Sequence, residues 1–227
     1  IGLFVCDHID KENVQEFGSY PDFFAALFPE FEIVQYEVTK GHFPDDLDEC
    51  DAYMTTGSRH SVYDDLPWIN QVKATIRDIY ATNKTFVGVC FGHQLLAEAL
   101  GGRVAKSPNG WSVGVHRFDV HEKQSWMKPF QPSLNLIMMC QDQVLDLPPE
   151  TKVLAGSPQC PVAIMQIGER MLGIQAHPEY TPAYDQILME KRAHKMGTHV
   201  VKRGIESFDI PVDRTVIRSW ILGFWGV

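Results

Sequence analysis

The residues of this chain that are best placed for chemistry surround a cysteine at the end of a short apolar run. Thr85–Val89 is predicted to be a buried strand, and the residues after Cys90 carry apolar side chains at helical spacing, so a sharp strand-to-helix turn is expected at Cys90. Gly88 and Gly92 flank it and leave room for the crossing backbones. At a helix N-terminus a thiolate is favoured over a thiol. The pattern therefore predicts that Cys90 is a nucleophile.

A histidine and a glutamate, His177 and Glu179, form a second candidate cluster. They follow the apolar run Met171–Ala176, and ligands of parallel α/β sheets bind at strand ends. A thiolate nucleophile needs a base, and the base needs a group that orients it. Glu179 could hold the His177 ring in one tautomer and stabilise its charged form. The two clusters together predict a catalytic triad of Cys90, His177 and Glu179.

The elements that must position these residues follow an α/β pattern. In the first half, four predicted strands alternate with helical patterns. The helical patterns begin after Ser19, cover Leu66–Thr82 and begin again after Cys90. The strands are Ile1–Cys6, Phe31–Val38, Asp51–Thr56 and Thr85–Val89. This alternation predicts a mostly parallel central sheet covered by helices on both faces. The closely spaced strands of the second half are predicted to extend that sheet in antiparallel fashion; they are Val113–Glu122, Leu134–Cys140, Lys152–Ala155, Val162–Ile167 and Met171–Gln175.

Two helices, near Ala183–Lys195 and Arg214–Phe224, are expected to close the chain. No repeat, low-complexity segment or long linker interrupts the sequence, so residues 1–227 are predicted to form a single domain.

The composition excludes several classes of function. With 44% hydrophobic and 22% charged residues, the chain has the balance of a soluble globular protein. A formal charge of −9 disfavours nucleic acid and anionic membranes as partners, and no apolar run is long enough to span a bilayer. Five cysteines without a C-x-x-C pair argue against a disulfide framework and a metal site, and favour a cytoplasmic location. No cofactor is expected.

At these motifs the chain resembles the class I, or triad, glutamine amidotransferases, in particular the stand-alone type related to the glutaminase domain of GMP synthase. Gly88-Val-Cys90-Phe-Gly92-His-Gln94 matches the family's G-x-C-x-G-x-Q elbow, and His177-Pro-Glu179 matches its H-P-E. Thr56-Gly57-Ser58 falls where the family has its oxyanion loop, with one glycine where many members have two. Cys140–Val144 resembles the H-x-D-x-V segment that lines the glutamine pocket, with Cys140 in place of the histidine.

The resemblance implies an activity and a role for several residues. The Cys90 thiolate would attack the γ-carbonyl of glutamine or of a γ-glutamyl compound, and His177 would protonate the departing amine. Water would then hydrolyse the resulting thioester to glutamate. The backbone N–H groups of Gly57 and Phe91 would hold the oxyanion. Substrate binding is implied for Gln94, Gln141 and Ser58, although Gln94 could instead be a helix residue that faces solvent.

Three functions remain open on the sequence. One is a glutaminase that feeds ammonia to a synthetase or ligase, which would be a separate subunit because the chain has no G-x-x-x-x-G-K-S/T phosphate loop. Another is a free-standing hydrolase of γ-glutamyl conjugates. The third is a catalytically quiet regulatory protein on the same scaffold, which the intact Cys, His and Glu argue against.

Overall fold

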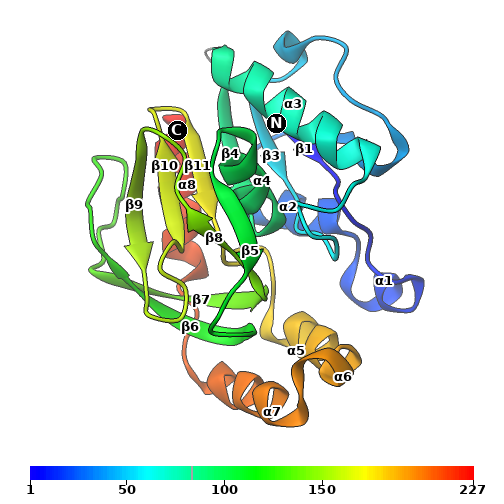
Figure 1. Cartoon of the computed structure of the whole chain (residues 1–227), viewed down its shortest axis with the longest axis vertical. Helices are drawn as coiled ribbons and strands as arrows, with labels where there is room; N and C mark the ends of the chain where they lie inside the picture. The colour runs from blue at the N-terminus through cyan, green and yellow to red at the C-terminus, as the bar shows by residue number, and fades with distance from the viewer. Residues whose placement is uncertain (83) are drawn as a thin grey trace.

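The computed structural model describes residues 1–82 and 84–227 (Figure 1). Within these residues one sheet contains nine strands in the order β2-β1-β3-β4-β11-β10-β9-β6-β7. The strands of the first half are β1 (Gly2–Phe4), β2 (Val34–Tyr36), β3 (Ala52–Thr55) and β4 (Thr85–Val89). Those of the second half are β6 (Ser112–Val120), β7 (Ser133–Cys140), β9 (Thr151–Gly156), β10 (Ile164–Ile167) and β11 (Met171–Ile174).

The parallel half of this sheet brings the candidate residues to one edge. Strands β2, β1, β3, β4 and β11 are all parallel, with Thr55 opposite Gly88 and Gly88 opposite Gly173. The segments that carry Gly57, Cys90 and His177 leave the carboxyl ends of the adjacent strands β3, β4 and β11. Three segments that are far apart in the sequence therefore meet where α/β sheets commonly bind ligands.

Side-chain alternation along the parallel strands divides the core into two layers. Leu3 and Met54 point to the face that is covered by helices α2 (Tyr20–Leu27) and α8 (Arg214–Trp225). Phe4 and Tyr53 point to the opposite face, against α3 (Pro67–Ala81) and α4 (Phe91–Ala99). A strand that is buried on both faces has apolar residues at every position. The predicted α/β architecture, with helices on both faces, is confirmed.

Helix α2 begins where its sequence predicts. The backbone N–H of Asp22 donates to Oγ of Ser19 at 3.3 Å, and the backbone N–H of Ser19 donates to Oδ2 of Asp22 at 2.7 Å. This capping box satisfies two N–H groups that would otherwise lack acceptors. The entry of α2 is thus determined locally, by four consecutive residues.

The antiparallel extension is confirmed for four strands and wrong for the fifth. Strands β10, β9, β6 and β7 pair in antiparallel fashion. Met171–Gln175 was predicted to be antiparallel as well, but β11 is antiparallel only to β10 and runs parallel to β4. The short turn between β10 and β11 makes these two strands antiparallel neighbours. The pairing of β11 with β4 depends instead on the return of the chain to the centre of the sheet, which no short turn determines.

Several elements have no counterpart in the sequence-based prediction. A separate antiparallel pair is formed by β5 (Arg103–Lys106) and β8 (Asp142–Asp146), and the additional helices are α1 (Lys11–Phe17) and α7 (Thr198–Glu206). The helix predicted at Ala183–Lys195 is divided at Arg192 into α5 (Pro182–Lys191) and α6 (Ala193–Met196). Helix α5 packs against β6 and β7, α7 packs against β6, and α6 packs against α5 and α7. None of the helices in the described ranges has the length and apolar character needed to cross a bilayer.

Candidate active site

Cys90 occupies a strained turn between β4 and α4. Its φ of 50° and ψ of −98° lie outside the regions that L-residues normally adopt, which costs on the order of 1–3 kcal/mol. The turn is tight because the backbones on either side of it nearly touch: a Cβ on Gly88 would lie 2.4 Å from the carbonyl carbon of Gly92. These features are those of a nucleophile elbow.

Gly92 offers a test of this packing. A Cβ at Gly92 would lie 1.6 Å from Oγ1 of Thr55, so Gly92→Ala is expected to destabilise the fold by about 1–3 kcal/mol, although the same change in an open helix would stabilise it. Urea denaturation should show a lower midpoint with an unchanged m value.

Removing the obstructing side chain provides the control for this variant. In the Gly92→Ala/Thr55→Ala double variant the clash with the threonine hydroxyl is absent, so the loss should be smaller than the sum of the two single losses. Additive losses would show that contact with the Thr55 hydroxyl is not the reason for glycine at position 92.

His177 and Glu179 form a buried pair beside the elbow. Nδ1 of His177 lies 2.7 Å from Oε1 of Glu179, and the two side chains are 2% and 0% exposed. A carboxylate can only accept, so Nδ1 donates to Glu179, and Nε2 is left for chemistry. The ring of Tyr180 stacks on His177 with 3.9 Å between centroids and 8° between planes. Tyr180 was not predicted, and its only sequence signal is that it directly follows His-Pro-Glu.

The surroundings of His177 favour its charged form. Burial disfavours the imidazolium, but the negative charges of Cys90 and Glu179 outweigh burial and raise the pKa of His177 to about 10. The ring is therefore protonated at neutral pH. This is the form that can donate a proton to a departing amine.

A chain of amide side chains also reaches the sulfur of Cys90. Nε2 of Gln175 donates to Sγ of Cys90 at 3.6 Å, and Oε1 of Gln175 accepts from Nε2 of Gln94 at 3.1 Å. Nε2 of Gln94 also donates to the carbonyl oxygen of Asp142 at 2.7 Å. Gln94 is thus buried in the site, and the alternative that it faces solvent is wrong. The role of Gln175 could not be predicted, because it is a strand-end residue without a distinctive neighbour.

The glycine of the Thr56-Gly57-Ser58 segment lies against the His177 ring. A Cβ on Gly57 would be 2.9 Å from Cε1 of His177 and 3.9 Å from Cβ of Cys90. Ser58 donates from Oγ to the carbonyl oxygen of Cys6 at 2.9 Å, which ties this loop to the end of β1. Phe91 is the first residue of α4, and its backbone N–H has no acceptor within the helix.

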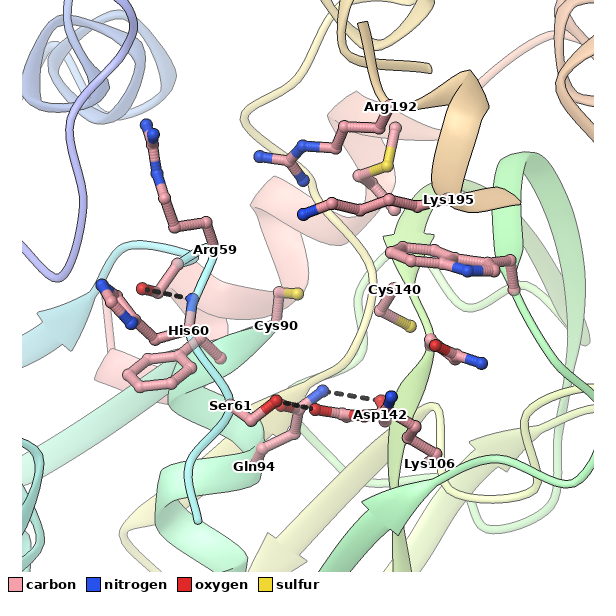
Figure 2. Close-up of a pocket in the computed structure, with 15 residues that line it drawn as sticks. Arg59, His60, Ser61, Cys90, Gln94, Lys106, Cys140, Asp142, Arg192 and Lys195 are labelled. Carbon is pink, nitrogen blue, oxygen red and sulfur yellow. Dashed lines mark hydrogen bonds between the residues drawn. The ribbon is translucent and has the colours of Figure 1, made fainter. Parts of the chain in front are cut away.

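A cavity of about 470 Å³ opens above Cys90 (Figure 2). Its walls include the predicted substrate-binding residues Ser58, Gln94 and Gln141, together with Phe91. Cys140 also lines it; burial, followed by the charge of Cys90, raises the pKa of the Cys140 thiol well above its usual value, so this second cysteine stays protonated. Cys90 and the other predicted lining residues therefore share one cavity, with His177 and Glu179 buried beside it.

Comparisons with known proteins agree with this geometry. The family model for class I glutamine amidotransferases matches residues 26–195. Gamma-glutamyl peptidase 3 from Arabidopsis thaliana is 32% identical over 183 residues, which are 75% of this chain and 73% of that protein. A GMP synthase from Aeropyrum pernix is 40% identical over 96 residues, which are 42% of this chain and 19% of the synthase.

Solved structures share this fold. A crystal structure of a glutamine amidotransferase from Thermotoga maritima superimposes with a TM-score of 0.78 at 18% identity, covering 100% of this chain and 99% of the other. The sequence motifs, the arrangement of strands and the match over residues 26–195 agree with one another. This chain belongs to the class I glutamine amidotransferase family.

Proposed function

We propose that the chain is a cysteine hydrolase of γ-glutamyl amides, with Cys90, His177 and Glu179 as its catalytic triad. The observation that carries this proposal is the strained elbow cysteine beside a buried His–Glu pair. A strained backbone at a helix N-terminus holds the sulfur in one place. The carboxylate holds the imidazole in the tautomer that leaves Nε2 available.

The reaction would run in two halves through a thioester. The Cys90 thiolate attacks the γ-carbonyl carbon, and the oxyanion is held by the N–H groups of Gly57 and Phe91. His177 gives its Nε2 proton to the amine nitrogen as the C–N bond breaks. Water then attacks the thioester while neutral His177 accepts a proton, and the C–S bond breaks to release the γ-carboxylate of glutamate and the Cys90 thiolate.

The same cavity would bind the γ-glutamyl group. Because Nε2 of Gln94 donates to the protein, its Oε1 remains as an acceptor for the substrate's α-ammonium. The hydroxyl of Ser58 donates to Cys6, and retains lone pairs that can accept. Gln141 lies on the same wall. These three residues are proposed to select the γ-glutamyl moiety.

The proposed substrate is a γ-glutamyl conjugate rather than free glutamine. The relative from Arabidopsis thaliana is named a gamma-glutamyl peptidase and is matched over most of its length. A cavity of about 470 Å³ is in the size range that accommodates drug-sized ligands, so it has room for a substituent beyond the γ-glutamyl group. The second candidate, glutamine hydrolysis for a separate synthetase, is supported by the similarity to GMP synthases.

Glutamate release from a panel of γ-glutamyl compounds separates these candidates. A conjugate hydrolase should show a kcat/KM for some γ-glutamyl peptide that is about tenfold or more above that for glutamine, because remote contacts with the leaving group lower the barrier. A glutaminase subunit should be slow on the whole panel and respond to a synthetase. Fast turnover of plain glutamine by the pure protein would contradict both.

A further inference from the structure

The cavity above Cys90 is lined by an excess of positive charge, although the chain as a whole is acidic. The sequence has 29 Asp and Glu against 20 Lys and Arg. Among the described residues, the charged side chains of the cavity wall are Asp142 on the acidic side and Arg59, Lys106, Arg192 and Lys195 on the basic side. The charged side chains of the cavity wall are thus mostly positive, whereas the net charge of the chain is negative. A positively charged cavity concentrates anions.

One of the four cations is already paired with carboxylates. Arg59 pairs with Asp7 at 2.9 Å and with Asp10 at 3.3 Å, and its side chain is directed away from the cavity (Figure 2). Lys106 on β5 lies opposite Asp142 in the β5–β8 register, so it is next to the acidic residue of the cavity wall, although no ion pair within the described residues joins the two side chains. Arg59 therefore needs no ligand to balance its charge, and Lys106 lies on the same side of Cys90 as Asp142 (Figure 2).

Arg192 and Lys195 are not compensated. Both belong to the junction between α5 and α6, and in residues 1–82 and 84–227 they form only backbone hydrogen bonds. The neighbouring Lys191, by contrast, pairs with Asp10 and Glu12. The buried carboxyl of Asp185 lies on α5, but burial raises its pKa to about 7 and no ion pair within the described ranges joins it to Arg192.

The position of this cation pair relative to Cys90 indicates which part of a substrate it would meet. Arg192 and Lys195 point into the cavity from one side of Cys90, while Gln94 and Asp142 lie on the other side (Figure 2). If the γ-glutamyl group occupies the Gln94 side, the group on the far side of the scissile bond lies toward Arg192 and Lys195. That group is the departing amine.

We infer that Arg192 and Lys195 form a subsite for a negatively charged leaving group, so that the preferred substrates are γ-glutamyl amino acids or peptides with a free carboxylate. This inference rests on the proposed function and names the substrate class within it. The guanidinium of Arg192 can bind a carboxylate through two parallel hydrogen bonds, and the ammonium of Lys195 adds a second point charge. Neutral amides of the same size would lack these contacts.

The test compares γ-glutamylglycine with γ-glutamylglycinamide, which share the scissile bond and nearly the same size but differ in charge. The wild-type protein should hydrolyse the acid with a kcat/KM about tenfold above that for the amide, the difference that a charge-assisted hydrogen bond confers. In the Arg192→Gln/Lys195→Gln variant that ratio should fall to about one. Arg192→Lys retains the charge and should keep part of the preference.

The matched control is Lys191→Gln, which removes an adjacent cation that is paired with carboxylates outside this cavity. Its ratio for the two substrates should equal that of the wild-type protein. Equal kcat/KM for acid and amide in the wild-type protein, or an unchanged ratio in the double variant, would overturn the subsite and leave the hydrolase proposal in place. Failure to release glutamate from these two compounds would overturn the subsite, and failure on the whole γ-glutamyl panel would overturn the hydrolase proposal as well.

Discussion

Replacement of Cys90 by serine is expected to abolish turnover while the protein remains folded. The serine hydroxyl stays protonated at neutral pH, so the strong nucleophile is lost, and the expected reduction in kcat is about 1,000-fold or more. Because Cys90 is 5% exposed and the replacement is nearly isosteric, circular dichroism and the thermal midpoint should change little. Activity on γ-glutamyl substrates provides the measurement.

Covalent labelling identifies the nucleophile independently of turnover. A diazo-ketone analogue of glutamine should modify Cys90 and spare the other four cysteines, including Cys140 in the same cavity, whose thiol is held in the protonated form. The matched control, Cys140→Ser, should still be labelled at Cys90. A label that maps to Cys140 would contradict the assignment of the nucleophile.

Replacement of His177 by alanine is expected to cost about as much as the loss of Cys90. The proposed triad acts as one unit, so the Cys90→Ser/His177→Ala double variant should be scarcely slower than either single variant. Glu179→Gln should cost less than His177→Ala, since the amide oxygen can still accept from Nδ1, but it removes a charge that raises the pKa of His177. Single-turnover kinetics on one γ-glutamyl peptide provide the comparison.

The pH dependence of Glu179→Gln distinguishes lost charge from lost structure. With one negative neighbour removed, the pKa of His177 should fall, so the alkaline limb of the kcat profile should move to lower pH. A variant that merely misfolds would lose amplitude without moving the limb. Multiplicative losses in the Cys90–His177 double variant would contradict a shared catalytic unit.

Local sequence was sufficient wherever a feature depends on neighbouring residues. The elbow follows from glycines two positions before and after Cys90, because only glycine allows β4 and α4 to approach so closely. The start of α2 follows from Ser19 and Asp22, which cap each other. The alternation of apolar strands and helical patterns likewise predicted the parallel sheet of the first half, and with it the edge at which Cys90 lies.

Tertiary structure decided the features that depend on distant segments. The parallel pairing of β11 with β4, the contact of Gln175 with Cys90 and the position of Arg192 above the cavity each join residues that are far apart in the chain. The residues next to a position in the sequence do not indicate such distant partners, because register and long-range packing are determined only when the whole sheet forms. The sequence alone thus predicted the residues of the proposed catalytic triad, whereas the folded chain decided which charges surround them.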